Sequence, residues 1–531
     1  MLLFALLAVA DAAAAGPYQG HCSPLWPGKR SDPGCWAWDW QFSYHPVTTS
    51  SPTVGDSSGG LFVNGTWHMF YSCTGGWCHL STTDLVHYES HGIIVPQTSP
   101  DYPQHLGLGT GSVLAAPDGS VMAFCNNVNG HMRSTVRPSP PSAHTLPPHT
   151  HSLLLPAGPP PTRCTTRLKQ DGMKTWTAHA TTTKGSPGGR DQARPLQSKD
   201  GTWFQMMGCG GSKGAAVCRF RATDTTLSNW TFSGMLFQSN TTWSGVGGHF
   251  VNFYEVPDFY PLTSASGTTK HVLVTDPWAQ GGPGGAGYHV HNVEWRSGVW
   301  SDDGSSFKVE KTACLDYVSA AASFAAGVRS LKEAPVPQGW WYAARSIADG
   351  TNTGRRIMSG NIGTDVTHGA QSVGGRVPGA GGIRMFTSLP REVELANDGT
   401  VHVKPPPELS GLRAGAAKTT PLTAFKCGQQ TSLGADIVTG EFEVMLDVAD
   451  IQEGMEVGVF VLGSPQMEEA VYVGYDGASV FVDMRNSSQN TTLFQSSFRA
   501  SNIAPFPKPA SGVLQLHVRH RFFPGKCPPV S

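Results

Sequence analysis

The chain has 531 residues, a formal net charge of −1 and only 14% charged residues. This balance argues against a nucleic-acid-binding protein or one that docks on an anionic membrane surface, and no segment has the 18 consecutive apolar residues of a transmembrane helix. The length suits two or three domains, and the many Gly (63), Pro (40), Trp (15) and Phe (24) residues favour an all-β protein with many turns.

The N-terminal residues 1–16, "MLLFALLAVADAAAAG", combine a short apolar run with small residues. This pattern is typical of a signal peptide cleaved near residues 13–16, and predicts an extracellular or vacuolar protein; the alternative is a disordered start. Five glycosylation sequons agree with secretion, at Asn64, Asn229, Asn240, Asn486 and Asn490.

The 11 cysteines include three locally spaced pairs. In an oxidising compartment these pairs would form disulfides, whereas in a reducing one they would be free thiols. They are Cys22/Cys35, Cys73/Cys78 and Cys209/Cys218.

From about residue 37 to 395, short aromatic or β-branched runs alternate with Asp-Gly, Asn-Gly and Gly-Gly turns. The clearest hairpin joins residues 61–63 to residues 66–71 through Asn64-Gly65. Antiparallel hairpins repeated over such a length predict a β-propeller or a large sandwich.

Residues 131–165 break this pattern, with nine prolines between positions 138 and 161 and no acidic residue. Such a segment cannot run through a sheet. We interpret it as a disordered insertion or as translated non-coding sequence.

A Pro- and Gly-rich linker over residues 396–420 precedes a second β-rich region, residues 421–531. Its alternating runs predict a β-sandwich. The alternation stops abruptly at residues 519–531, so we expect this sandwich to lack its final strands.

Three acids stand in small-residue or aromatic contexts, where a propeller would gather them at a central pocket: Asp56, Asp191 and Glu255. Glycoside hydrolysis needs a pair of carboxyl groups that flank the scissile bond. Each acid also has a structural interpretation. Asp56 could stabilise a turn, Asp191 could pair with a neighbouring arginine, and Glu255 could be a surface acid before a proline.

The motifs around these acids resemble glycoside hydrolase family 32, the family of invertases, fructan hydrolases and fructosyltransferases. "GDSSGGLFVNGTWHMFY" is similar to the family's Asn-Asp-Pro-Asn-Gly motif and the strand after it. Arg190-Asp191 matches its Arg-Asp-Pro motif, and "YEVPDFYPL" its Glu-Cys-Pro-Asp motif. Further matches, "WCHLSTTDLVHY", "GTGSVLAAPDG", "CLDYVSAAASF" and "LPREVEL", follow in family order.

The resemblance implies an N-terminal five-bladed β-propeller at residues 37–395 followed by a C-terminal β-sandwich. It also implies release of fructose from sucrose or fructans by a retaining mechanism, without metal or organic cofactor. Asp56 would be the nucleophile, Glu255 the acid/base and Asp191 the transition-state stabiliser. The implied substrate-binding residues are Arg190, Trp77, Ser72, Ser112 and Asp316, with Trp77 the best candidate for stacking on a sugar.

The chain departs from the family pattern beside all three acids. The two Asn side chains next to the nucleophile are replaced in Gly55-Asp56-Ser57-Ser58-Gly59, and Gln192 and Val256 stand where the family has Pro and Cys. We therefore keep two alternatives, a non-catalytic carbohydrate-binding homologue and a related propeller hydrolase of arabinosides or galactosides.

Overall fold

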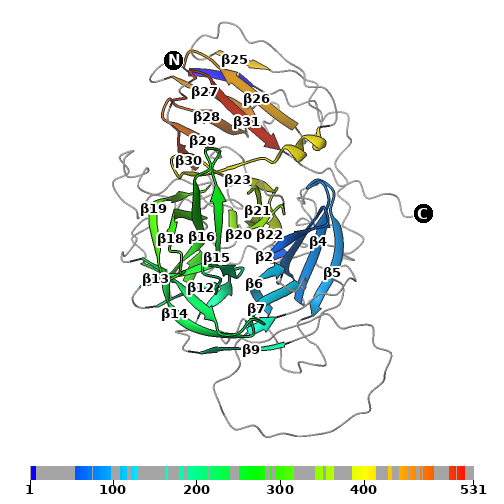
Figure 1. Ribbon diagram of the computed structural model, residues 1–531. Coiled ribbons are helices and arrows are strands. Elements are labelled where there is room, and N and C mark those ends of the chain that lie inside the picture. Colours follow the sequence, from blue (N-terminus) through cyan, green and yellow to red (C-terminus); the bar gives the residue numbers. More distant parts are fainter. Residues whose placement is uncertain are drawn as a thin grey trace, which may run out of the picture.

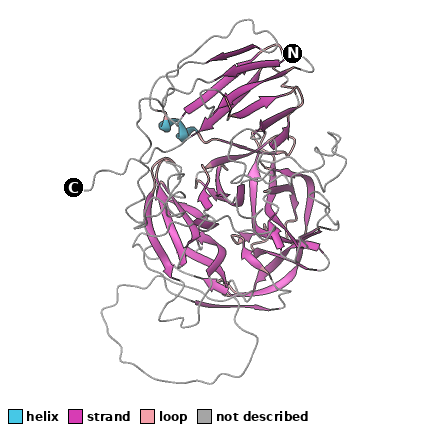
Figure 2. Ribbon diagram, turned by 180° about the vertical axis from the view of Figure 1, so that it is seen from behind, coloured by secondary structure: helices cyan, strands magenta, loops and turns pink. Residues whose placement is uncertain are grey.

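The computed structural model describes twenty-three segments of the chain. They are residues 2–6, 54–73, 76–96, 108–115, 121–127, 163–165, 179–184, 189–211, 214–239, 250–280, 287–289, 293–315, 341–350, 354–363, 385–413, 429–432, 442–451, 455–461, 467–468, 470–483, 502–506, 508–509 and 511–520. Strands make up most of them, and within them the one helical element is the 3-10 helix η3 (Pro407–Leu412) (Figure 2). These segments contain no helix long and apolar enough to span a membrane.

The larger part of the molecule is a ring of five blades, each built mainly from antiparallel strands (Figure 1). The first two blades contain β2 (Val54–Val63), β3 (Thr66–Cys73), β4 (Gly76–Thr82) and β5 (Glu89–Pro96), then β6 (Leu108–Ala115), β7 (Val121–Asn127), β8 (Arg163–Thr165) and β9 (His179–Lys184). The third contains β10 (Arg190–Gln192), β11 (Leu196–Gln197), β12 (Trp203–Gly211), β13 (Gly214–Ala222) and β14 (Asn229–Gln238).

The fourth and fifth blades complete the ring. The fourth contains β15 (Phe250–Thr263), β16 (Thr269–Gln280), β17 (Gly287–His289), β18 (Glu294–Trp300) and β19 (Phe307–Cys314). The fifth contains β20 (Trp341–Ala348), β21 (Arg356–Gly363), β22 (Met385–Thr387), β23 (Arg391–Leu395) and β24 (Val401–Lys404).

The inner strands contact one another in the cyclic order β2, β6, β10, β15, β20 and back to β2. Five apolar clusters follow the same order, one between each pair of neighbouring blades. The last cluster joins Trp67, Met69 and Leu80 of the first blade to Ile347 and Ile357 of the fifth. The ring is therefore closed by side-chain packing, because hydrogen bonds alone would leave each blade with an apolar face in water.

The Asn-Gly hairpin forms as predicted. Asn64 and Gly65 both have positive φ, 51° and 78°, and connect β2 to β3. This backbone twist matches that of the two strands, and Asn and Gly are the residues that tolerate it best.

The second part is a sandwich that lies against one side of the ring (Figure 1). One sheet has the order β25 (Gln429–Ser432), β1 (Leu2–Leu6), β27 (Glu456–Val461), β28 (Val471–Tyr475), β29 (Ser479–Asp483) and β30 (Asn502–Pro505), and the other pairs β26 (Phe442–Val448) with β31 (Leu514–His520). The two sheets share an apolar core that includes Val448, Val457 and Leu516. The all-β class and the propeller–sandwich order are thus as predicted.

Three boundaries differ from the sequence-based predictions. Val401–Lys404, predicted as linker, pairs with β23 as the outer strand of the fifth blade. Arg163–Thr165, at the end of the predicted insertion, pairs with β9; residues 131–162 lie outside the described segments. Both strands are too short for an alternation of apolar and polar residues to identify them in the sequence. Leu2–Leu6 form a strand between β25 and β27, and signal-peptide cleavage stays a prediction.

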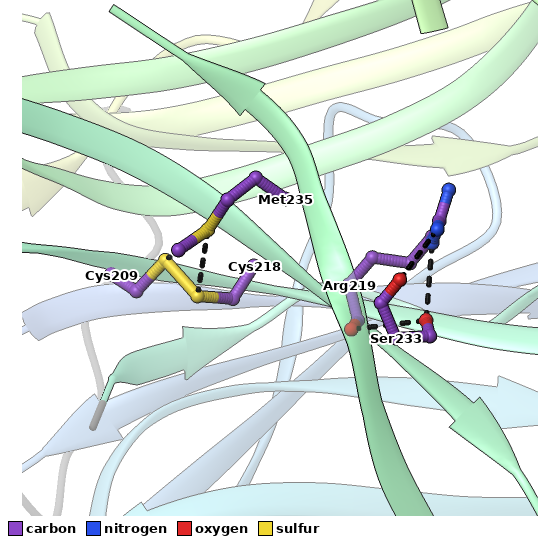
Figure 3. The surroundings of a disulfide bond; sticks show 5 residues. All are labelled: Cys209, Cys218, Arg219, Ser233 and Met235. Carbon is purple, nitrogen blue, oxygen red and sulfur yellow. Dashed lines mark hydrogen bonds between the residues drawn. A yellow bond between two sulfur atoms is a disulfide. The ribbon is translucent and has the colours of Figure 1, made fainter. Parts of the chain in front are cut away.

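Two predicted disulfides form, Cys73–Cys78 and Cys209–Cys218; Cys22 and Cys35 lie outside the described residues. Cys209–Cys218 joins neighbouring strands of the third blade, and the sulfur of Met235 lies 3.4 Å from Cys218 Sγ (Figure 3). The soft thioether of Met235 on β14 thus packs on the disulfide that joins β12 to β13.

Candidate active site

Every inner strand of the ring carries a β-bulge where it pairs with the second strand of its blade. The register shifts fall between Val54 and Ser57, Leu108 and Gly111, Arg190 and Gln192, Glu255 and Asp258, and Tyr342 and Arg345. A bulge bends its strand and re-aims the local side chains. The three predicted acids all lie in or beside these bulges.

Asp56 lies in the bulge of β2 and is partly buried. Its Oδ2 accepts a hydrogen bond of 2.6 Å from the hydroxyl of Thr110 on β6, and its carbonyl oxygen accepts one of 3.3 Å from Ser72 Oγ. A Cβ on Gly55 would lie 2.5 Å from that Ser72 oxygen, so the tight approach requires glycine. A turn-stabilising Asp bonds its own backbone, whereas this carboxylate binds a hydroxyl of the next blade.

Asp191 is the extra residue in the bulge of β10 and is 5% exposed. Its Oδ2 accepts a hydrogen bond of 3.2 Å from the backbone N–H of Val256, the residue after Glu255. The neighbouring Arg190 Nε lies 3.7 Å from the same oxygen. The carboxylate of Asp191 is thus fixed directly beside the strand that carries Glu255.

Glu255, on β15, is 3% exposed and is not the surface acid that its sequence context allowed. Its Oε2 accepts a hydrogen bond of 2.5 Å from the hydroxyl of Tyr342 on β20. Its Oε1 forms an ion pair with Arg190, whose guanidinium also stacks on Phe253. Each oxygen of this carboxyl group therefore has a different partner.

Tyr342 shows that the acids converge. Its pKa is raised well above the ordinary value, first by burial and then by the negative charges of Asp56, Asp276 and Asp191. Asp276, on β16, is the register partner of Glu255 and is itself buried. The tyrosine therefore keeps its proton and remains a hydrogen-bond donor at the centre of four carboxyl groups.

The backbone at the site adopts uncommon conformations. Asp191, Val256 and Ala343 have positive φ values of 62°, 45° and 53°. A β-branched residue such as Val rarely adopts such a φ. Such strained conformations persist only where the contacts of the surrounding structure hold the backbone in place, and they are concentrated at active sites.

Of the predicted binding residues, Arg190 and Ser72 lie at the site, where Arg190 pairs with Glu255 and Ser72 supports the backbone of Asp56. Ser112 lies on β6 two residues after Thr110 and is buried. Asp316 falls outside the described residues.

The stacking prediction for Trp77 is wrong. Its side chain is 0% exposed within the apolar core between the first two blades, and its Nε1 donates to the carbonyl oxygen of Gly109 at 3.0 Å. A ring enclosed on both faces has no surface for a sugar. Trp77 instead packs behind the strand that carries Thr110.

The sequence reading missed Thr110, Tyr342, Asp276 and Arg345. Thr110 had a signal, since it lies in the same "GTGS" segment as the predicted Ser112. The others carried no local signal, because their partners lie on other strands, far away in the sequence. The described residues contain no group of His, Cys, Asp and Glu side chains arranged to hold a metal ion.

The profile of the glycosyl hydrolases family 32 N-terminal domain matches residues 47–145 and 161–406. The chain belongs to glycosyl hydrolase family 32. It is therefore a glycoside hydrolase by family, and the matched residues include Asp56, Asp191 and Glu255. The unmatched residues 146–160 fall inside the Pro-rich segment that interrupts the pattern of the sequence.

Solved structures of family 32 enzymes share the fold over nearly the whole chain. Exo-inulinase from Aspergillus awamori is 17% identical, with 90% of this chain and 89% of that chain covered and a TM-score of 0.60. Fructan 1-exohydrolase IIa from Cichorium intybus is 14% identical (91% and 92%, TM-score 0.58). Sucrose-6-phosphate hydrolase from Lactobacillus gasseri is 14% identical (91% and 85%, TM-score 0.53). No curated protein matches the sequence.

Proposed function

We propose that this family 32 protein releases fructose from β-fructofuranosides, such as sucrose or fructans, by double displacement. The observation that carries the proposal is the placement of Asp56, Asp191 and Glu255 on three inner strands of one ring, where each accepts a hydrogen bond from a neighbouring blade, from Thr110, Val256 and Tyr342 respectively. Two carboxyl groups beside one bond are what retaining hydrolysis requires.

In the first step, Asp56 attacks the anomeric carbon of the fructosyl unit and a new C–O bond forms. The bond to the leaving oxygen breaks as Glu255 transfers its proton to that oxygen. The hydroxyl of Thr110 stabilises the ionised form of Asp56 before attack. Asp191 binds ring hydroxyls while positive charge develops on the sugar.

The contacts of Glu255 suggest which oxygen carries the proton. Oε2 accepts from Tyr342, which stays protonated, so the transferable proton belongs on Oε1. Arg190 occupies Oε1 in the structure, and its side chain is 45% exposed and able to swing aside for the leaving oxygen. In the second step Glu255 takes a proton from water, whose oxygen attacks the anomeric carbon and releases Asp56.

The choice of fructosides is supported by the names of structural neighbours. The Cichorium intybus exohydrolase has been solved in complex with 1-kestose, and a Bombyx mori β-fructofuranosidase mutant in complex with sucrose. Those ligands belong to those proteins, and they define the first substrates to test here.

We also propose that the protein is secreted. The apolar N-terminal residues 1–16 support this, as do the disulfides Cys73–Cys78 and Cys209–Cys218. Disulfides persist in oxidising compartments and are rare in the cytosol. Asn64, within a sequon, is exposed at the tip of its hairpin.

The deciding experiment measures free fructose after incubation with sucrose, inulin and levan, with the Asp56→Asn variant as the blank. Release by the wild type and not by the variant supports the proposal. Binding of fructans without turnover would favour the non-catalytic alternative, and release of arabinose or galactose from their glycosides would favour the other hydrolase.

A further inference from the structure

Arg345 is a buried arginine that reaches beneath the site from β20. Its side chain is 2% exposed. Nη1 donates to the carbonyl oxygen of Pro257 at 3.0 Å, and Nη2 donates to the carbonyl oxygen of Asp191 at 3.3 Å. One guanidinium group therefore joins the bulge of β15 to the bulge of β10.

The stem of Arg345 also lies against β2, the strand of Asp56. A Cβ built on Gly59 would lie 3.6 Å from Cδ of Arg345, and Gly59 has a φ of +72°. Gly59 is three residues from Asp56 on β2, in the stretch that lacks the family's Asn side chains. The arginine thus contacts or supports β2, β10, β15 and its own strand, which are four of the five inner strands.

The charge of Arg345 acts on several acids at once. Both Nη atoms bind backbone carbonyl oxygens rather than a carboxylate. Burial lowers the pKa of the guanidinium, while Asp258, Asp191, Asp276 and Asp56 raise it. Arginine stays protonated in proteins, so its positive charge attracts the carboxylates around it.

The need for such a charge follows from the groups that surround Asp56. Asp56 shares the surroundings of Tyr342 with Asp191 and Arg190 on β10, Glu255 on β15 and Asp276 on β16, and Arg345 comes from the same strand as Tyr342. Neighbouring carboxylates disfavour one another's ionisation. Arg190 pairs with Glu255 and is half exposed, whereas Arg345 is a buried cation that can oppose this repulsion.

We propose that Arg345 is a positioning residue for the glycosidase reaction: it fixes the strands that carry Asp191 and Glu255, and its buried charge keeps Asp56 ionised for attack. This role rests on the proposed function. The role has two parts, the forked hydrogen bonds and the positive charge. Different substitutions of Arg345 remove one part and keep the other.

The test compares Arg345→Gln, which keeps hydrogen-bond donors without the charge, with Arg345→Lys, which keeps the charge without the fork. For each variant kcat/KM for fructose release is measured against pH. In Arg345→Gln we expect the midpoint of the acidic limb to move up by about one pH unit. In Arg345→Lys we expect the midpoint to stay near that of the wild type and kcat to fall.

Arg356→Met is the matched control. Arg356 is also buried, but its Nε donates to Ser346 Oγ and its guanidinium stacks on Tyr260. Its charge interacts with Asp258 and Tyr260 rather than with Asp56. We expect this variant to lose thermal stability with an unchanged acidic limb. An unmoved limb in Arg345→Gln, or an equal shift in Arg356→Met, would overturn the proposal.

A second readout keeps this inference separate from the proposed function. With 13C at the aspartate carboxyl carbons, the NMR signal of Asp56 is identified by its absence in Asp56→Asn, and its titration midpoint needs no substrate. If the wild type releases no fructose, the proposed function fails. The role of Arg345 is then supported if Arg345→Gln raises this midpoint, and it is overturned if the midpoint does not move.

Discussion

The ring and the sandwich are both all-β, yet they bury different residues. In the described part of the ring, buried polar and charged residues extend from Ser57 to Ser388. In the described part of the sandwich, the buried residues are Val, Leu, Ile, Met, Ala, Tyr and Gly. Each inner strand of the ring pairs with a register shift, whereas β26 and β31 pair over seven residues without one.

This difference indicates where the molecule carries its chemistry. Buried carboxylates and positive φ values at ordinary residues both cost stability, and they occur together at the site, at Asp191 and at the neighbours Glu255 and Val256. The described part of the sandwich has positive φ values at Asp450 and Met467, outside its strands, but it buries no carboxylate and contributes apolar packing. Substitutions in the two regions should therefore separate activity from stability.

The largest expected effect is that of Asp56→Asn. An amide cannot form the covalent intermediate, so fructose release should fall by on the order of 10⁴-fold or more. The side chain keeps its shape and its contact with Thr110, so the melting temperature should change little, and fructan binding should remain measurable by calorimetry. Activity retained within tenfold would mean that Asp56 is only a structural residue.

The matched sandwich variant is Val459→Ala. Val459 is fully buried between the two sheets, and removing two methyl groups should lower the free energy of unfolding by about 1–3 kcal/mol. We expect kcat per folded molecule to be unchanged. A loss of kcat here would show that the sandwich acts on the site and would break the comparison.

The next effect is that of Glu255→Gln, which removes the transferable proton. Turnover of sucrose, a substrate with a poor leaving group, should fall by about 10²–10⁴-fold. An aryl fructoside has a leaving group that needs less protonation. In a single-turnover measurement of the first step, the variant should therefore lose less of the wild-type rate on this substrate than on sucrose. Equal losses on both substrates in that step would remove the acid role from Glu255.

The sequence predicted those features of this site that depend on local pattern. Asn64-Gly65 fixes its hairpin through its own backbone preferences, and the two local disulfides follow from cysteine spacing. Asp56, Asp191 and Glu255 were found through short motifs around each acid. What holds them, however, comes from other blades, as with Tyr342, 87 residues from Glu255.

The incorrect predictions have the same origin. Trp77 looked like a sugar platform because nothing in its own segment shows that Gly109 and the second blade enclose it. Arg345 stands in a segment with no motif, and its importance appears only when β10 and β15 lie on either side. Local pattern thus identifies the candidate acids, while ring closure supplies the side chains that hold them.

A smaller effect is expected for Tyr342→Phe, which removes the hydrogen bond to Glu255. Hydrogen bonds to charged groups contribute about 1.5–3 kcal/mol, so kcat should fall by roughly 10- to 100-fold. The loss should appear most in the step that needs Glu255 ionised, so the fructosyl-enzyme should accumulate and be visible by intact-protein mass spectrometry. Tyr260→Phe, at a buried tyrosine between the fourth and fifth blades, is the control. A loss below threefold in Tyr342→Phe would contradict the assignment.

The smallest expected effect concerns acid stability, and it depends on a histidine in the first blade. His79 on β4 is 0% exposed, its ring stacks 4.7 Å from Phe70 and 4.3 Å from His91, and its Nε2 lies 3.0 Å from His68 Nδ1. Burial, and then the neighbouring His91 and His68, lower its pKa from 6.5 to about 2.

The sign of the effect follows from proton uptake. Above pH 6.5 the imidazole is neutral in both states, so this group adds no pH dependence. Below pH 6.5 the unfolded chain binds a proton at this imidazole, whereas the folded chain does not bind it until about pH 2. The free energy of unfolding therefore decreases as the pH is lowered from 6.5 towards 2. At pH 4.5 the loss amounts to about 2–3 kcal/mol.

The measurement is denaturant unfolding at pH 7.0 and 4.5 for the wild type, for His79→Gln and for His402→Gln, at an exposed histidine of β24. Comparing the two pH values within each variant cancels the packing cost of the substitution itself. We expect the acid-induced loss to shrink by about 2–3 kcal/mol in His79→Gln and to stay unchanged in His402→Gln. An equal acid loss in all three proteins would mean that the acid sensitivity lies outside this cluster, because only His79→Gln removes a buried imidazole that must stay neutral for the first blade to pack.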